Sequence, residues 1–285
     1  MKLQKLNKLL AGALCLCLFA CDSNENPGEN PPTDNGKVNP ETVFTGKRFQ
    51  QVGNMKMNYD SEGFLTLLEK GSTNVTFEYQ TGSRSNLPAK SVIMTIIDKN
   101  YPDEKMVMNL VIGENGFVKE CYETEYFANE QPEEEYWAFE YDTDGYLVQM
   151  KRSEGDNEVT KMVYKDGNLV SSTMTSDDPD NSQYSTIQYI SDKVTESIEN
   201  KGCIMCYDQT FGVDLDEMDY AFYAGLLGKA TKHLPLSTTI SSDPNDSNPR
   251  VDTHEWTLNQ DGYPIKLTIT SSLFPNFAEE EEFKW

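Results

Sequence analysis

The sequence predicts a mainly β protein in which the strands run up and down in a single antiparallel meander. Short apolar or alternating segments recur from about Thr42 onward, and turns that contain glycine separate them. Aromatic residues are frequent, with 15 Tyr and 13 Phe in 285 residues. Alternation with period two is typical of strands that cover a core with one face and meet water with the other. We therefore expect one β domain over residues 42–278.

Five turns repeat one pattern, in which a glycine follows a polar residue between two segments that resemble strands. They are Glu62-Gly63, Asn115-Gly116, Asp144-Gly145, Asp166-Gly167 and Asp261-Gly262. Asp-Gly and Asn-Gly in this setting are the strongest local hairpin signal, and they predict tight turns whose two central residues both have positive φ. A sixth copy, 189–194, lacks the glycine.

The spacing of the turns gives the size of the repeating unit. Tyr141, Tyr164 and Tyr189 precede successive turns and lie 23 and 25 residues apart, which suits two strands and two turns. Polar segments at 153–157 and 177–182 return the chain between units. Such a unit builds an up-and-down antiparallel sheet.

One segment departs from the β pattern. Apolar residues from Met218 to Leu226 fall at helical spacing, acidic residues precede them, and Gly228 follows them. Acidic residues favour a helix start and glycine favours a helix end. The pattern predicts one helix near 214–227 that covers an open end or face of the sheet, and Leu234-Pro235-Leu236 then opens another strand.

The N-terminus has the layout of a secretory signal peptide. Lys2, Lys5 and Lys8 precede an apolar run from Leu9 to Ala20, too short to span a bilayer. The run ends in Leu-Phe-Ala-Cys, which resembles a bacterial lipobox, and this resemblance implies cleavage of residues 1–20 and lipidation of Cys21. Ordinary signal cleavage is the alternative, but it requires a small residue where Leu18 stands.

The segment that follows Cys21 predicts a tether. Residues 22–40 are rich in Pro, Asn and Gly and nearly free of apolar residues, so they cannot bury enough surface to fold. We expect residues 21–41 to link the lipid to the domain. Asp22 and Glu25 resemble the acidic export signals that send Bacteroidetes lipoproteins to the cell surface.

Charge excludes two classes of partner. Loss of the three lysines in residues 1–20 takes the formal net charge from −23 to −26. A chain this acidic repels nucleic acid and anionic membrane surfaces. We therefore expect no nucleic-acid partner and a membrane contact through the lipid alone.

Three features together resemble a known family. They are the Tyr-Asp-x-Asp-Gly-Tyr-Leu turns, the segment from Tyr223 to Pro235, and the late Gln260-Asp261-Gly262-Tyr263-Pro264. The combination is similar to a Bacteroidetes lipoprotein family of unknown function with a porin-like fold, over roughly residues 55–275. The resemblance implies a barrel-like antiparallel sheet in a tethered periplasmic or surface protein. It implies no enzymatic activity and brings no catalytic residues.

Cysteine use indicates little cross-linking. After removal of the signal peptide and lipidation of Cys21, only Cys121, Cys203 and Cys206 remain, which allows at most one disulfide. Cys203-x-x-Cys206 lies about eight residues before any predicted helix, so the strand-to-helix context of a redox motif is missing. We expect a local disulfide or half-buried thiols in a strand, and a redox pair or a weak metal site is the alternative.

The two histidines and the acidic runs have structural interpretations. His233 follows the predicted helix and suits a cation at its C-terminus, and His254 alternates with neighbours that predict a surface position in a strand. The runs 133–135 and 279–282 predict a solvated loop and, over 279–285, a solvated acidic tail. The pair Asp142 and Asp144 faintly resembles a calcium loop but lacks its final glutamate.

No motif for nucleophilic, phosphate-binding or zinc-dependent catalysis is present, so we predict no catalytic residue, metal or cofactor. Trp137, Trp256 and Trp285 could stack on a sugar, although core packing is the usual role of tryptophan.

These observations predict a lipid-anchored protein of the outer membrane, facing the periplasm or the cell surface, that is not an enzyme. It would bind a glycan, a lipid or a protein, and the mouth of a barrel is a natural ligand site. The alternatives are a glycan hydrolase with two catalytic carboxylates and a packed structural or protein-interaction module.

Overall fold

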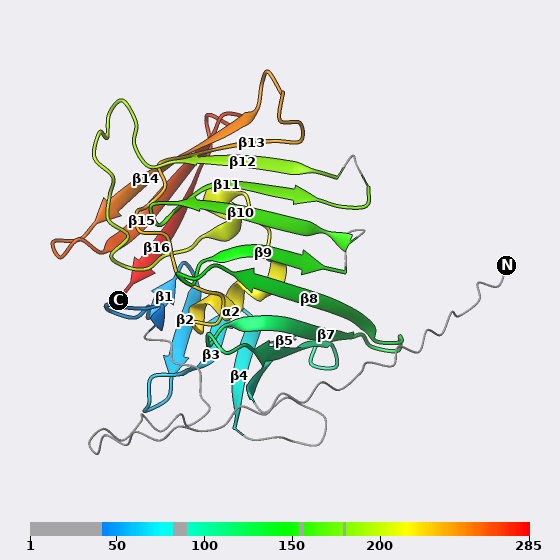
Figure 1. Cartoon of the computed structure of the whole chain (residues 1–285). Coiled ribbons are helices and arrows are strands. Elements are labelled where there is room, and N and C mark those ends of the chain that lie inside the picture. Colours follow the sequence, from blue (N-terminus) through cyan, green and yellow to red (C-terminus); the bar gives the residue numbers. More distant parts are fainter. Residues whose placement is uncertain (1–41, 82–89, 154–156, 179–180) are drawn as a thin grey trace, which may run out of the picture. The chain divides into compact units, whose positions relative to one another are not determined.

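The computed structural model describes residues 42–81, 90–153, 157–178 and 181–285 (Figure 1). The predictions for the signal peptide 1–20, for Cys21 and for the tether up to residue 41 lie outside the described residues. In the described part of the chain, no helix is long and apolar enough to cross a membrane.

Sixteen strands of the described residues form a closed barrel in which sequence neighbours are also neighbours in the sheet (Figure 1). Each strand is antiparallel to the next, and the first pairs with the last. The strands are β1 Gln51–Val52, β2 Met55–Tyr59, β3 Leu65–Lys70, β4 Thr73–Thr81, β5 Lys90–Asp98, β6 Lys105–Ile112, β7 Val118–Tyr126, β8 Glu133–Tyr141, β9 Leu147–Arg152, β10 Val159–Lys165, β11 Asn168–Thr175, β12 Gln183–Gln188, β13 Ser237–Ser241, β14 Arg250–Leu258, β15 Pro264–Ser271 and β16 Ala278–Lys284. The single antiparallel up-and-down meander and its barrel form are therefore confirmed.

Both acidic runs belong to strands, which corrects the prediction of a loop and a tail. Residues 133–135 open β8, and residues 279–282 lie in β16, whose pairing with β1 closes the barrel. Alternation separates the glutamates of β16: Glu280 forms an ion pair with Lys266 outside, at 2.9 Å, whereas Glu279 and Glu281 line cavities inside. The β domain thus extends beyond residue 278 to the end of the chain.

The turn glycine has a positive φ in all five repeated turns, but only Asp166-Gly167 has two central residues of this kind. In the turn at Gly145, the amide of Gly145 donates to the carbonyl of Asp142, and the amide of Asp142 donates to Tyr146. The register shifts by one residue at the end of β8. This pattern is a three-residue loop with a bulge at glycine, and the turns at Gly63, Gly116 and Gly262 share it.

The predicted helix over 214–227 is wrong in its extent. Its residues form a single 3₁₀ turn, η3 Asp216–Met218, followed by the short helix α2 Asp219–Tyr223. Gly225 and Gly228 have φ of 76° and 82°, so the chain cannot continue as a right-handed helix through them. A π-helical turn, η2 Tyr207–Phe211, precedes both elements.

Residues 189–236, which we call the inserted segment, leave the sheet after β12 and fill much of the barrel. Phe211, Met218, Phe222 and Leu226 are each at most 1% exposed. Inward side chains of β11, β12 and β13 donate hydrogen bonds to backbone carbonyls of this segment. The helical elements lie within the ring of strands (Figure 1), so they form part of the core.

The barrel has two different ends. At the end that carries the five repeated turns, which we call the turn end, the inserted segment hydrogen bonds to the hairpins: Lys229 donates to Gly145 at 2.9 Å and Lys232 to Gly167 at 2.8 Å. A Cβ on Gly228 would lie 2.8 Å from the Gly145 carbonyl oxygen, so only glycine fits there. The described chain also enters the barrel here, where Lys47 donates to Tyr263. A cavity lined by Thr45, Lys201 and His233 also lies at this end. The opposite end, which we call the mouth end, holds the cavity described below.

Candidate functional site

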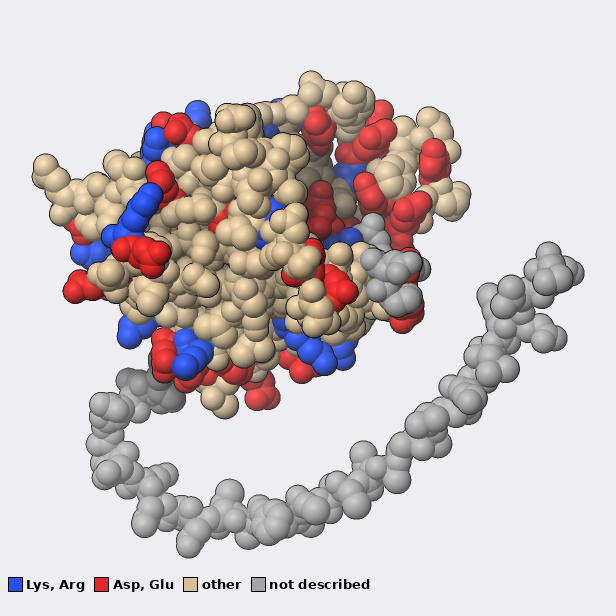
Figure 2. All heavy atoms as spheres, turned by 90° about the horizontal axis from the view of Figure 1, so that it is seen from above, with Lys and Arg blue, Asp and Glu red and all other residues tan. Residues whose placement is uncertain are grey.

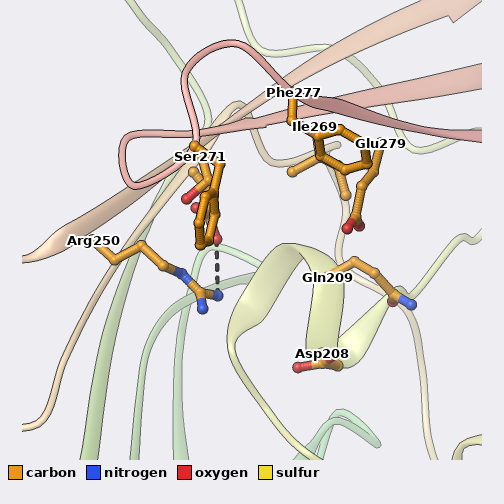
Figure 3. Close-up of a pocket in the computed structure, with 9 residues that line it drawn as sticks. Asp208, Gln209, Arg250, Ile269, Ser271, Phe277 and Glu279 are labelled. Atoms are coloured by element: carbon orange, nitrogen blue, oxygen red, sulfur yellow. Dashed lines mark ion pairs between the residues drawn. The ribbon is translucent and has the colours of Figure 1, made fainter.

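A cavity of about 270 Å³ lies inside the mouth end of the barrel; we call it the mouth pocket (Figure 3). It is lined by the η2 turn, by β14 and β15, by the loop that joins β15 to β16, and by β16. The lining residues are Asp208, Gln209, Arg250, Asp252, Ile269, Ser271, Phe274, Phe277 and Glu279.

Strand register brings the polar lining together. Asp252 of β14 lies opposite Ser271 of β15, and Ile269 of β15 lies opposite Glu279 of β16. Alternation directs one face of each strand inward, so these residues point to one space. Glu279 points from β16 toward the turn that carries Asp208 and Gln209 (Figure 3).

Asp252 is the most deeply buried charge of the mouth pocket, with 4% of its surface exposed. Its Oδ2 atom forms an ion pair with Nη2 of Arg250 at 2.9 Å. Its Oδ1 atom and the Nε atom of Arg250 are both buried, and neither has a hydrogen-bond partner among the described residues. A buried polar atom in this state requires an explanation, and a ligand in the pocket is one.

The mouth pocket carries negative charge. Burial raises the pKa of Asp208, and the neighbouring carboxylate of Asp214 raises it further, against the opposing effect of Arg250. Figure 2 shows Asp and Glu side chains gathered around a hollow on the right side of the barrel. Because carboxylates that crowd together repel each other, a cation in this space would be stabilised.

A second, smaller cavity of about 140 Å³ lies beside the mouth pocket and shares Gln209 with it. Lys70, Asp219 and Glu281 supply its charges. Burial raises the pKa of Asp219 to about 7, and Lys70 opposes this shift. Asp219 is therefore partly protonated near neutral pH.

On the opposite wall of the barrel, Trp137 packs in the core and does not form a sugar-stacking platform. It is 1% exposed, its Nε1 atom donates to Glu123 at 3.0 Å, and the Arg152 guanidinium lies 5.0 Å from its ring centre. Trp256 and Trp285 each donate to a backbone carbonyl at 2.7 Å. Core packing thus describes Trp137, and Trp256 and Trp285 are partly buried and pack against the core.

Cys203 and Cys206 are free cysteines in the described residues, as is Cys121. Cys203 has φ of 51° and its sulfur lies 3.8 Å from the Thr45 hydroxyl, whereas Cys206 is buried beside the second cavity. Neither cysteine lies in a strand. No group of three or more His, Cys, Asp or Glu in the described residues could hold a metal ion.

Both histidines differ from their predicted settings. His233 does not cap a helix, because α2 ends ten residues earlier, at Tyr223; its amide donates to Asn168 instead, at 3.0 Å. His254 is 2% exposed and not a surface residue, since alternation along β14 places Asp252 and His254 inside and Glu255 outside. Burial lowers the pKa of His254 to about 4.

The feature that resembled a calcium loop is a hydrogen-bonded turn. Oδ1 of Asp142 accepts hydrogen bonds from the amides of Asp144 and Tyr146, at 3.0 and 2.9 Å. Such a side chain stabilises the turn by itself.

Comparison with known proteins identifies the family of this fold. Residues 51–266 match the model of the family described as "Domain of unknown function (DUF4595) with porin-like fold". The chain belongs to this family.

Solved structures support the same fold for this DUF4595 protein. It is similar to a porin-like protein from Bacteroides uniformis, with a TM-score of 0.60 at 16% identity over 81% of this chain and 88% of that one. It is also similar to a porin-like protein from Bacteroides vulgatus, with a TM-score of 0.53 at 16% identity over 84% and 99%. No curated protein matches the chain.

Sequence reasoning missed the mouth pocket. The available signal was the alternation from Glu279 to Phe283, in which every second residue faces the interior. The sequence does not show that the lining residues of β14 and η2 lie near those of β16, because that proximity follows from the closure of the barrel and from the path of the inserted segment.

Proposed function

We propose that this DUF4595 protein is a lipid-anchored, non-enzymatic binding protein of the outer membrane that holds a small ligand in the mouth pocket. The observation that carries the proposal is the buried Asp252 carboxylate, whose Oδ1 atom has no partner among the described residues and which lines a cavity. A ligand there would complete the hydrogen bonding that the protein leaves open.

The position of the pocket suits an anchored protein. The described chain enters the barrel at the turn end, where Phe44 packs on Phe222 and Lys47 contacts Tyr263. A tether that begins at a lipidated Cys21 would therefore join the barrel at the end opposite the mouth. This arrangement leaves the mouth pocket open to molecules that approach the membrane surface.

The outer face of the barrel is suited to water and not to lipid. Lys56, Glu78, Lys161 and Glu255 occupy exposed positions within strands. Charged residues on the lipid face of a membrane barrel are destabilising by about 2–4 kcal/mol at mid-depth for Lys. Membrane contact through a lipid on Cys21 is compatible with this surface.

The inserted segment limits what the barrel can hold. Its buried side chains occupy the lumen below the mouth, so the interior does not form a through-channel for a large solute. The remaining mouth pocket, at about 270 Å³, is near the lower end of the volumes usual for ligand sites. This favours a small ligand over a packed module without one.

A glycan hydrolase is the second candidate, and one observation favours it. Asp208, whose pKa is raised by burial, and Glu279 lie in the same pocket, and glycoside hydrolysis uses a pair of carboxyl groups that flank the scissile bond. This candidate predicts that a bound glycan is cleaved.

A native mass spectrum of the mature domain, incubated with the low-molecular-mass fraction of a cell envelope extract, tests the proposal. The wild type should carry a bound small molecule whose mass equals that of the same molecule in the extract, which shows that it is not cleaved. Ser271→Trp fills the mouth pocket and should abolish the adduct, whereas Thr270→Trp, on the outward face of the same strand, should retain it. An adduct that survives in Ser271→Trp, or none in the wild type, contradicts binding at the mouth. Hydrolysis products would support the enzyme instead.

A further inference from the structure

We propose that the mouth pocket recognises an organic cation, an ammonium or guanidinium group held by the carboxylates of Asp208, Asp252 and Glu279 beneath the rings of Phe274 and Phe277. This inference rests on the proposed function and specifies the chemistry of its ligand.

The charge balance of the lining favours a cation. Arg250 and Asp252 neutralise each other through their ion pair, which leaves the carboxylates of Asp208 and Glu279 without a cation of their own in the lining. Hydrogen bonds between an ammonium group and a carboxylate are about twice as strong as those between neutral groups. A bound cation would oppose the effects of burial and of the neighbouring Asp214 carboxylate, which raise the pKa of Asp208.

Asp252 supplies the second, independent indication. Its side chain is more than nine-tenths buried, and burial of an ionised oxygen without a hydrogen-bond donor is costly. Arg250 occupies Oδ2, so Oδ1 is the atom that lacks a donor among the described residues. An N–H of the ligand would supply that donor.

The loop between β15 and β16 contributes the aromatic part of the site. Phe274 and Phe277 are 66% and 63% exposed, which is unusual for phenylalanine, and both line the mouth pocket. A cation over an aromatic ring is stabilised by about 0.5–2 kcal/mol, more when water is excluded. If these rings close over a bound cation, they exclude water from it and strengthen the interaction.

The arrangement suits an organic cation better than a metal ion. The carboxylates come from η2, β14 and β16 and surround a space of about 270 Å³. A divalent metal requires ligand oxygens within about 2.0–2.6 Å of one point, and no group of three such side chains in the described residues is placed for it. An organic cation with several N–H groups does not require its acceptors to converge on one point.

Titration calorimetry on the mature domain tests the inference with three probes: spermidine as a free amine, the blocked peptide acetyl-Gly-Lys-Gly-amide, and neutral cellotriose. We expect spermidine or the peptide to bind more tightly than cellotriose, and the stronger of the two cations identifies the ligand as a free amine or a basic side chain. Glu279→Gln should weaken that binding at least tenfold, as should Asp252→Asn and the double variant Phe274→Ala/Phe277→Ala.

The matched control is Glu280→Gln, which removes the same charge from the outer face of the same strand and should change affinity less than twofold. If Glu279→Gln and Glu280→Gln lose affinity equally, the cation is attracted by the overall negative charge and not by the pocket. That result would overturn the inference. Tighter binding of cellotriose, lost in Ser271→Trp, would also overturn it but leave the proposed binding function intact. No binding of any probe would overturn it as well. Glu279→Gln changes an exposed side chain, so its result does not depend on the fold of Asp252→Asn.

Discussion

At the scale of single residues, the recurring tyrosines tie neighbouring hairpins together. The hydroxyl of Tyr141 donates to the carbonyl of Val118 at 2.8 Å, and that of Tyr189 donates to Leu169 at 2.9 Å. Each acceptor lies at the start of the preceding strand, two residues after its turn glycine. Tyr164 has the same place in the repeat, but its hydroxyl is buried without a partner among the described residues.

This difference gives a matched pair of predictions. Tyr141→Phe removes a hydrogen bond and should lower the free energy of unfolding by about 1 kcal/mol. Tyr164→Phe removes an unpaired buried hydroxyl and should leave that free energy unchanged or raise it. Urea unfolding of both variants measures the two values. Equal losses in the two would show that the hydroxyl bonds do not stabilise the barrel.

The anchor depends on one residue. Cys21→Ala removes the thiol that the lipobox presents for lipidation, so the variant should move from the membrane fraction to the soluble fraction. Immunoblots of fractionated cells measure the distribution, with Cys203→Ala as a control that should stay in the membrane. Unchanged partitioning of Cys21→Ala would refute the lipid anchor.

At the scale of elements, local signals predict the position of each turn, but they predict the turn type for Asp166-Gly167 alone and the inserted segment poorly. The glycine at each turn was evident, because no other residue adopts its φ so readily. The Asp-Gly pattern does not predict the role of Asp142, whose side chain accepts hydrogen bonds from two amides of its turn. The helix was overestimated because helical spacing between Met218 and Leu226 also occurs in a buried chain that turns at Gly225.

The strand β16 is not predicted, for a related reason. A run of glutamates resembles a solvated tail when read alone, and only its pairing with β1 and β15 reveals a strand. Closure of a barrel joins the two ends of a chain, and a local pattern does not contain that information.

The inserted segment should be a structural part of the barrel. Phe222 is fully buried and packs edge-on against Phe44 and Tyr207. Phe222→Ala should therefore lower the free energy of unfolding by about 3–5 kcal/mol, as is usual for deletion of a core aromatic ring, and amide exchange should quicken throughout the strands. Faster exchange confined to residues 214–235 would show instead that the segment is a mobile lid.

At the scale of the whole molecule, the acidic chain places several carboxylates inside the barrel near its mouth, where removal from water is costly. The formal net charge is −23, and several carboxylates face the interior near the mouth. Burial raises the pKa of Glu123 to about 7, although its hydrogen bond from Trp137 opposes the shift. Its neighbours Glu135 and Glu217 add to the shift. Carboxylates at the mouth end are therefore both partly buried and close enough to repel each other.

The raised pKa of Glu123, caused first by burial and then by neighbouring carboxylates, gives stability a defined pH dependence. Glu123 keeps its proton in the folded state up to about pH 7 but loses it near its ordinary pKa when unfolded, so its contribution is full below about pH 4.5 and is lost as the pH rises through 7. Glu123→Gln cannot ionise, and its stability relative to the wild type should improve by roughly 1–3 kcal/mol between pH 5 and pH 8.

Urea unfolding at the two pH values measures this change, and the comparison with the wild type removes the effects of other groups, such as His254. Glu140→Gln, at an exposed outward position of β8, serves as the control and should show no such change. A flat difference for Glu123→Gln would mean that this carboxylate ionises normally in the barrel.

The central claim is that the mouth end, and not the turn end, meets the ligand. Hydrogen exchange of the mature domain with and without the low-molecular-mass envelope extract tests it most directly, because it locates binding without identifying the ligand. The account predicts slower exchange in peptides that cover residues 206–214, 250–254 and 269–281. Protection at residues 142–147 and 226–234 of the turn end, or no protection in any peptide, would contradict it.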